Sequence, residues 1–247
     1  MSRNSQPRVV VFTPLKMRHR YFIKKLIENG IKIDTVVVPN KDLKFRIKLI
    51  KFLSISAILD GVLSCFEILL KGNILFSQKR LKIVNNYKEK SIPGLLDNKM
   101  IDAALIYGGP IIPNSILKSV CIPFLNVHGA VLPGYRGLDS HWWLFMDNRT
   151  ELQGYSIHAV AKELDSGKIF KTRRFSSRKF SITRLLLWRL WIAENSAKDI
   201  AEILYKPILL KKSSNHDLEF SVYRSSISLS KWLYYKKKSR NFQIDNE

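Results

Sequence analysis

Cysteine and nucleotide-binding loop motifs are scarce or missing in this chain of 247 residues. The two cysteines, Cys65 and Cys121, lie far apart in apolar surroundings. They form neither a disulfide framework nor a zinc-type spacing, and we expect buried thiols in a reducing compartment. The sequence contains no G-x-G-x-x-G run and no Walker-type loop, so it lacks the usual signs of dinucleotide or nucleoside triphosphate binding.

A long uninterrupted apolar run is also missing. Residues 1–7 lead directly into a β-branched segment without the apolar stretch of a signal peptide, which predicts a cytoplasmic protein. Residues 43–70 approach the length of a membrane span, but Asp60, Gly61 and Glu67 interrupt them. We expect a helical insertion there instead, with one or two amphipathic helices on the domain or at a partner surface.

Acidic residues are few, with 20 Asp and Glu against 42 Lys and Arg, for a formal net charge of +22. Such a charge favours encounters with nucleic acid, an anionic membrane face or phosphate-bearing small molecules. Residues 231–240 mix cations with aromatics, which suits weak contact with an anionic membrane or with nucleic acid. A lysine-rich, solvated surface explains the charge equally well, so charge alone selects no partner, and the sequence indicates no oligomeric state.

The residues that are present alternate short β-branched runs with helical patterns. Strands are expected over residues 8–13, 33–38, 81–85, 103–107, 122–128, 154–161 and 168–175. Helices are expected over residues 18–29, 93–98, 113–120, 141–146 and 182–205. This order predicts an α/β fold with a mostly parallel central sheet. Periodicity fades beyond Pro207, which divides the chain into a main domain, residues 8–206, and a basic C-terminal extension, residues 207–247.

The richest chemical information lies at the end of the strand over residues 122–128. Asn126 and His128 are two residues apart, so both side chains emerge from one face of that strand. Asp165 follows in a loop. An amide can stabilise a developing oxyanion, an imidazole can exchange protons near neutral pH, and a carboxylate can accept the proton of an attacking amine. Together they predict acyl transfer to an amine, although a turn-capping Asn and a backbone-bonded His would explain the first two alone.

Other polar residues suggest weaker hypotheses. Arg18 and His19 open the first helix, where they could hold a phosphate or sugar or form a solvated basic turn. His128, His141 and His158 are 13 and 17 residues apart, which matches no metal-ligand spacing, so we expect no metal. His158 either braces the site from a neighbouring strand or is a satisfied structural histidine.

The run Asn126-Val-His128-Gly-x-x-Leu-Pro-x-Tyr-Arg-Gly137, followed by Gly154-x-x-Ile-His158 and Leu164-Asp165-x-Gly167, closely resembles the 10-formyltetrahydrofolate-dependent formyltransferases. The resemblance extends over residues 8 to about 175. It implies a Rossmann-like formyltransferase fold, 10-formyltetrahydrofolate as co-substrate and catalytic roles for Asn126, His128 and Asp165.

The resemblance also implies a folate pocket and a substrate site. The expected folate contacts are Ile106, Tyr107, Gly108, Gly109 and Ile111. Close backbone approach to the ligand is what glycine permits there, although an ordinary strand-to-helix turn would also explain the glycine pair. The expected substrate contacts are Arg18, His19, Tyr135, Arg136, Gly137 and His158.

Two departures from the family pattern bear on the acceptor. Ala130 stands where many relatives have serine. The separate C-terminal β-barrel with which methionyl-tRNA formyltransferases bind tRNA is not recognisable. The first departure removes a hydroxyl contact and so weakens any specific assignment of the acceptor, and the second counts against tRNA. From the family analogy, the missing tRNA domain and the run Arg18-His-Arg-Tyr21, we expect a primary amine on an amino sugar of a surface polysaccharide pathway, carried on a nucleotide. The alternatives are a tRNA-directed formyltransferase, a formyltetrahydrofolate deformylase and a non-enzymatic binding protein.

Overall fold

The computed structural model describes residues 5–38, 65, 82–85, 91–97, 100–175, 182–206, 208–211 and 221–224. The helical insertion expected over residues 43–70 lies outside these residues except at Cys65. Most of the C-terminal extension, including residues 231–240, also lies outside them.

The described elements agree with the expected strands and helices to within two residues at each end. In chain order they are β1 (Arg8–Phe12), α1 (Met17–Glu28), β2 (Lys32–Val38), β3 (Lys82–Asn85), α4 (Ile92–Leu96), β4 (Ala103–Tyr107), α5 (Asn114–Ser119), β5 (Phe124–His128), β6 (Tyr135–Gly137), α6 (Ser140–Met146), η3 (Thr150–Leu152), β7 (Gly154–Ala159), β8 (Ile169–Arg174), α7 (Ile182–Tyr205), α8 (Ile208–Lys211) and β9 (Val222–Arg224). Short elements such as β6, η3, α8 and β9 were not expected.

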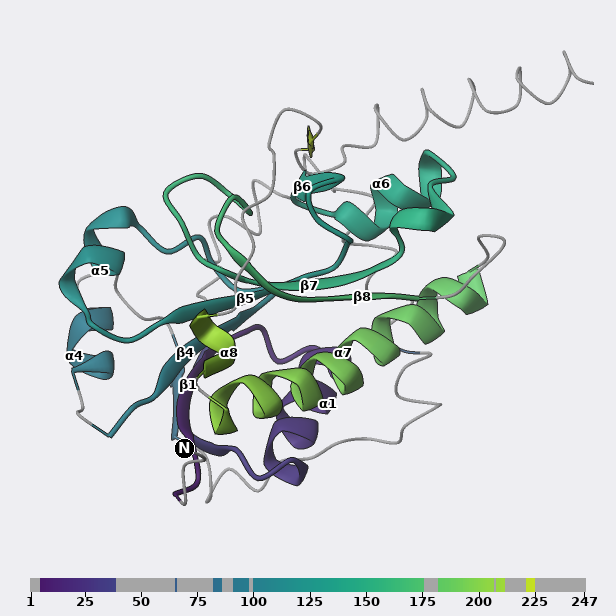
Figure 1. Ribbon diagram of the computed structural model, residues 1–247. Helices are drawn as coiled ribbons and strands as arrows, with labels where there is room; N and C mark the ends of the chain where they lie inside the picture. The colour runs from purple at the N-terminus through teal and green to yellow at the C-terminus, as the bar shows by residue number, and fades with distance from the viewer. Residues whose placement is uncertain are drawn as a thin grey trace, which may run out of the picture.

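A seven-stranded sheet runs in the order β3-β2-β1-β4-β5-β7-β8 (Figure 1). The first five strands in this order pair in parallel, and β7 and β8 extend the sheet with antiparallel pairing. This arrangement confirms the expected α/β class with a mostly parallel sheet. Because β4 and β5 are parallel neighbours, their carboxyl ends lie at one edge of the sheet, where open α/β sheets bind their ligands.

Helices cover both faces of the sheet, and the alternation of side chains along β1 shows why. Val9 and Val11 belong to a core cluster that includes residues of α1 and α7, whereas Val10 and Phe12 belong to a second cluster with residues of α4 and α5. Successive strand residues face opposite sides of a sheet. A strand buried on both faces therefore reads as the uninterrupted apolar run seen at residues 9–12.

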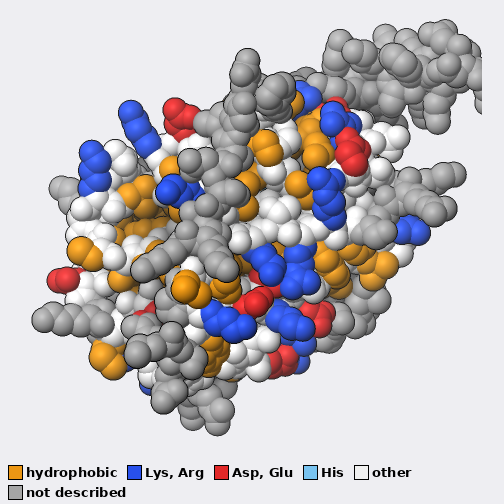
Figure 2. Space-filling model, viewed as in Figure 1, with side chains coloured by type: hydrophobic (Ala, Val, Ile, Leu, Met, Phe, Trp, Pro, Cys, Tyr) orange, Lys and Arg blue, Asp and Glu red, His pale blue; other side chains and the backbone are white. Residues whose placement is uncertain are grey.

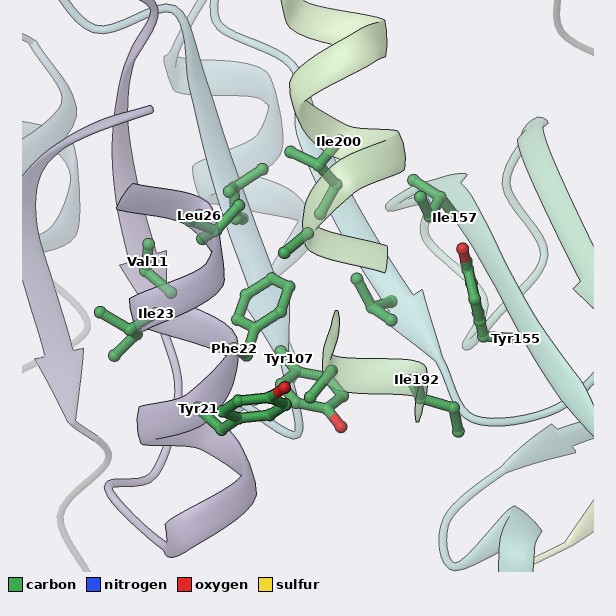
Figure 3. Close-up of a cluster of buried hydrophobic side chains, with 14 of the residues drawn as sticks. Val11, Tyr21, Phe22, Ile23, Leu26, Tyr107, Tyr155, Ile157, Ile192 and Ile200 are labelled. Carbon is green, nitrogen blue, oxygen red and sulfur yellow. The ribbon is translucent and has the colours of Figure 1, made fainter. Parts of the chain in front are cut away.

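The larger core lies between α1, α7 and the sheet. Figure 3 shows Phe22 and Leu26 of α1 facing Ile200 of α7, with Tyr107 at the end of β4 beneath them. Trp188 of α7 is fully buried and donates its indole N–H to the carbonyl oxygen of Gly154 at 3.1 Å. These contacts fix α7 against the sheet, so the helix can contribute side chains to the edge at which the parallel strands β4 and β5 end.

The expectation of buried cysteines is wrong, because both Cys65 and Cys121 are exposed. Cys121 precedes Pro123 and lies just before β5 rather than within it. Apolar neighbours in the sequence therefore did not indicate burial here. No helix in the described parts of the chain has the length and apolar character needed to cross a membrane.

Candidate active site

A cavity of about 440 Å³ opens where β4 and β5 end and α1 begins. All the residues predicted for the site line this cavity except Tyr135 and Arg136. The lining residues that were predicted are Arg18, His19, Ile106, Tyr107, Gly108, Gly109, Ile111, Asn126, His128, Gly137, His158 and Asp165. The cavity therefore brings together polar groups from three parts of the chain that are far apart in sequence.

Asn126, His158 and Asp165 are in mutual contact. The antiparallel pairing of β5 with β7 sets Asn126 directly opposite His158. The Asn126 amide nitrogen donates a hydrogen bond to Asp165 Oδ1 at 3.1 Å and lies 3.1 Å from His158 Nε2. His158 Nδ1 lies 2.7 Å from the carbonyl oxygen of Ala159. If Nδ1 carries the proton, Nε2 accepts from Asn126, and both hydrogens of the amide have partners.

His128 is buried beside the same carboxylate. Its Nδ1 lies 3.2 Å from Asp165 Oδ2, and its Nε2 lies 2.7 Å from the carbonyl oxygen of Tyr135. A carbonyl can only accept, so Nε2 carries a hydrogen. The Nδ1 atom then faces the carboxylate directly, which makes His128 and Asp165 one unit that can hold a further proton between them.

Asp165 is held as a carboxylate by its neighbours. Its backbone has a φ of +53°, a left-handed conformation in the turn between β7 and β8. The Gly137 N–H donates to Oδ2 at 2.9 Å. Burial alone would raise the pKa of Asp165, but His128, His158 and the Gly137 N–H outweigh burial and hold that pKa well below its usual range.

The imidazole of His128 differs from the Asp165 carboxylate, because burial decides the direction of its pKa shift. It is 5% exposed, and burial lowers its pKa below the ordinary value although Asp165 opposes this shift. An unprotonated imidazole beside an ionised carboxylate can bind one proton near neutral pH. The pair is therefore suited to accept a proton released within the cavity.

The glycine pair at the end of β4 is required by packing against the protein itself. Gly108 has a φ of +61°, and a Cβ atom there would lie 2.8 Å from His19 Nε2. At Gly109 a Cβ atom would lie 2.5 Å from the carbonyl oxygen of Phe12. Larger residues at these positions would push the turn away from β1 and α1, and so reshape the cavity wall.

Tyr135 and Arg136 are near the site but their side chains do not line the cavity. The Tyr135 hydroxyl donates to Asp147 Oδ2 at 2.5 Å, and burial together with that carboxylate raises the pKa of Tyr135 to about 12. Arg136 Nη1 lies 4.0 Å from Glu163 Oε2. The backbone of Tyr135 does reach the site, through its contact with His128.

Sequence reasoning missed several lining residues, among them the buried cation Arg189. Arg189 lies on α7 between Trp188 and Leu190 and is 2% exposed. A single cation on a helix face that is otherwise apolar at Leu185 and Leu186 was the available signal. Within the described residues, no group of three or more His, Cys, Asp or Glu side chains is arranged to hold a metal ion.

Comparison with known proteins agrees with this geometry. Residues 72–176 match the formyl transferase family. The chain is 36% identical over 66 residues to a methionyl-tRNA formyltransferase from Listeria welshimeri and 33% identical over 66 residues to a GDP-perosamine N-formyltransferase from Brucella melitensis. Each match covers 27% of this chain, and 21% and 25% of the respective relatives. The matches thus span about a quarter or less of those proteins.

Solved structures extend the similarity over most of the fold. One is an N-formyltransferase from Helicobacter canadensis in complex with folinic acid and dTDP-3-aminofucose, with a TM-score of 0.53 and 12% sequence identity. The alignment covers 89% of this chain and 70% of that one. The expected resemblance to formyltransferases is therefore confirmed, over residues 72–176 in sequence and over most of the chain in fold.

Proposed function

We propose that this chain, which carries the formyl transferase match and fold, is an N-formyltransferase that uses 10-formyltetrahydrofolate. The observation that carries the proposal is the contact network of Asn126, His128 and Asp165 inside the cavity at the ends of β4 and β5. These are an amide, an imidazole and an ionised carboxylate, the groups required to move an acyl group onto an amine.

The cavity suits a folate co-substrate in size and lining. Its volume of about 440 Å³ lies within the range of small-molecule sites. Ile106, Ile111 and Val160 provide apolar surface for a flat ring, and the polar network lies among them. We assign Ile106 to Gly109 and Ile111 as the wall that holds the co-substrate, which supplies the formyl group.

The protein residues then have distinct tasks. Asn126 is half-buried at the cavity, and we assign its amide as the donor to the formyl oxygen, whose negative charge grows as the amine attacks. In this assignment the N–H that faces His158 Nε2 turns to the formyl oxygen when the co-substrate binds, and the other N–H stays on Asp165 Oδ1. One such donor typically contributes about 10²–10³ in rate. The new C–N bond forms as the bond from the formyl carbon to N10 of the folate breaks.

Proton balance involves the His128–Asp165 pair. The attacking amine loses one proton and the departing N10 gains one. The pair can take up the first proton because burial keeps His128 unprotonated and Asp165 stays ionised. It can return a proton to N10 directly or through water, which restores the starting state.

For the acceptor we propose an amino sugar of surface polysaccharide biosynthesis, linked to a nucleotide. The solved relative in complex with dTDP-3-aminofucose and the GDP-perosamine N-formyltransferase support this class. Lys16, Arg18 and Arg189 line the same cavity and provide positive charge toward a diphosphate. The catalytic network determines the reaction, whereas these peripheral residues would select the acceptor.

A panel assay tests both parts of the proposal. The full chain is incubated with 10-formyltetrahydrofolate and nucleotide-linked amino sugars, glycinamide ribonucleotide or methionyl-tRNA, and each acceptor is analysed for the mass of one added formyl group. We expect formylation of at least one amino sugar. Formate release that does not depend on any acceptor would identify a deformylase instead.

A tRNA-directed formyltransferase is the second candidate, favoured by the match to the Listeria methionyl-tRNA formyltransferase. The net charge of +22 also suits a nucleic acid. Formylation of methionyl-tRNA, together with tRNA binding that weakens steeply with salt, would favour this candidate over the amino sugar.

A further inference from the structure

A strand from the C-terminal part of the chain docks directly on the turn that supports the catalytic network. β9 pairs in parallel with β6, with Tyr135 opposite Val222 and Gly137 opposite Arg224. The Val222 N–H donates to the carbonyl oxygen of Gly134 at 3.0 Å, and the Leu138 N–H donates to that of Arg224 at 2.9 Å. β6 is therefore held along its full length by residues more than eighty positions later.

The backbone of β6 contacts two members of the network. The carbonyl oxygen of Tyr135 accepts from His128 Nε2 at 2.7 Å, and the Gly137 N–H donates to Asp165 Oδ2 at 2.9 Å. These two contacts lie at the two ends of a three-residue strand. A shift of β6 would lengthen both at once, because a strand this short moves as a unit.

The side chain of Arg224 anchors β9 to the same region. Its Nη2 donates to Asp147 Oδ2 at 2.9 Å, the oxygen that also accepts from the Tyr135 hydroxyl. Its guanidinium carbon lies 4.7 Å from the centre of the Trp143 ring of α6, within cation–π range. One arginine thus ties β9 to α6 and β6 together.

The fit between the two strands is close. A Cβ atom at Gly137 would lie 2.1 Å from the carbonyl oxygen of Arg224. Only glycine allows this approach, and Gly137 also has a φ of +101°. In the same arrangement the Gly137 N–H donates to Asp165 Oδ2.

We propose that β9, anchored by Arg224, is a positioning element of the active site that sets β6 so that its backbone orients His128 and Asp165. Neither Arg224 nor β9 lines the cavity, so their effect is transmitted through Tyr135 and Gly137. The catalytic consequence rests on the proposed formyl transfer, whereas the structural consequence can be measured without it.

The direct test measures hydrogen exchange at the Gly137 amide by NMR in the full-length chain. Arg224→Met removes the contacts with Asp147 and Trp143. We expect Gly137 exchange to accelerate by tenfold or more, while core amides of β1 remain protected. Arg8→Met is the matched control, because Arg8 pairs with Asp34 at similar exposure, 23% against 26%, but lies at the start of β1.

A second variant keeps the test decisive if Arg224→Met does not fold. Val222→Pro removes the N–H that bonds Gly134 while leaving Arg224 in place, and Val222→Ala, which keeps that N–H, is its control. Val222 is 39% exposed, so the loss of buried side chain is small. Unchanged Gly137 exchange in a folded Arg224→Met or Val222→Pro protein would overturn the proposal.

Kinetics provide the catalytic readout. With an acceptor found in the panel assay, we expect Arg224→Met to lower kcat by about 10- to 100-fold, as misplacement of catalytic groups does, with little change in KM for 10-formyltetrahydrofolate. Arg224→Lys should recover part of kcat. A raised KM at unchanged kcat would contradict positioning. If the unmodified chain transfers no formyl group, the proposed function fails while the exchange comparison still decides the role of β9.

Discussion

Asp165 combines a left-handed backbone, deep burial and an ionised side chain, and one substitution isolates the contribution of the charge. Asparagine also tolerates a positive φ, so Asp165→Asn keeps the backbone and removes the charge. We expect a loss of about 1–3 kcal/mol in the free energy of unfolding near neutral pH, the cost of disturbing a buried hydrogen-bonded group.

The pH dependence of that loss has a definite sign. The pKa of Asp165 is held below its unfolded value of about 3.9. Its contribution to stability is therefore complete above that value and disappears as the pH falls through the folded pKa. Urea unfolding of both proteins, from neutral pH to about pH 3, should show the difference narrowing. A difference that stays constant at all pH values would contradict the assignment.

The lowered pKa of His128 predicts the pH dependence of catalysis. Because burial disfavours the charged imidazole, we expect its pKa to lie below the unperturbed value of about 6.5. NMR titration of the histidine rings measures it directly, with His128→Asn used for assignment. The acid limb of kcat at saturating acceptor should share that midpoint. A His128 titration above about 6.5 would mean that the imidazole is already protonated when it is needed.

The sequence predicted the catalytic cluster but not every residue around it. The spacing of Asn126 and His128 on a strand, and the later Asp165, predicted a cluster that the structure brings together. The spacing could not show that Tyr135 turns toward Asp147 or that Arg189 reaches the cavity. Those positions depend on the packing of α6 and α7, which short sequence motifs do not encode.

At the scale of secondary structure, the two glycines at positions 137 and 94 make a matched pair. Gly137→Ala forces a Cβ atom to within 2.1 Å of a backbone oxygen of β9 at a positive φ. At Gly94, in α4, a Cβ atom meets nothing within 4 Å. We expect Gly137→Ala to destabilise the protein by about 1–3 kcal/mol and Gly94→Ala to stabilise it by about 0.4–1 kcal/mol.

Urea or thermal unfolding of the two alanine variants measures this contrast. The same variants also report on the pairing of β6 with β9, because only Gly137 lies on that contact. Equal stability of the two proteins would show that β9 does not pack closely against β6 in solution.

Most elements of four or more residues were predictable, and those of three residues were not. The 24 residues of α7 repeat a helical pattern, and β1 is an apolar run typical of a strand buried on both faces. β6 and β9 have three residues each, too few for any period to show, and they become strands only through each other. The exposed cysteines illustrate the same limit, because burial depends on tertiary contacts.

At the scale of the whole molecule, Lys and Arg outnumber Asp and Glu by 42 to 20. Figure 2 shows Lys and Arg side chains across the described part of the visible face, with acidic side chains among those near its centre. A distributed charge of this kind acts mainly on encounter rates with anions. It does not by itself define a docking site.

This charge predicts a dependence of catalysis on salt. If the acceptor carries a diphosphate, kcat/KM should fall as ionic strength rises toward about 0.15 M, where the screening length is about 8 Å. An uncharged amino sugar of the same stereochemistry, if it is formylated at all, should show a much weaker dependence. Equal salt dependence for the two acceptors would place the effect in the folate step or in protein stability.

Formyl transfer through the Asn126–His128–Asp165 network is tested most directly by single-turnover assays of Asn126→Ala beside the unmodified chain. The assay uses 10-formyltetrahydrofolate and the amino-sugar acceptor found in the panel, with circular dichroism to verify folding. Loss of the donor to the formyl oxygen should slow transfer by about 10²–10³, with co-substrate binding largely retained. A folded Asn126→Ala protein that transfers the formyl group at the rate of the unmodified chain would contradict the assignment.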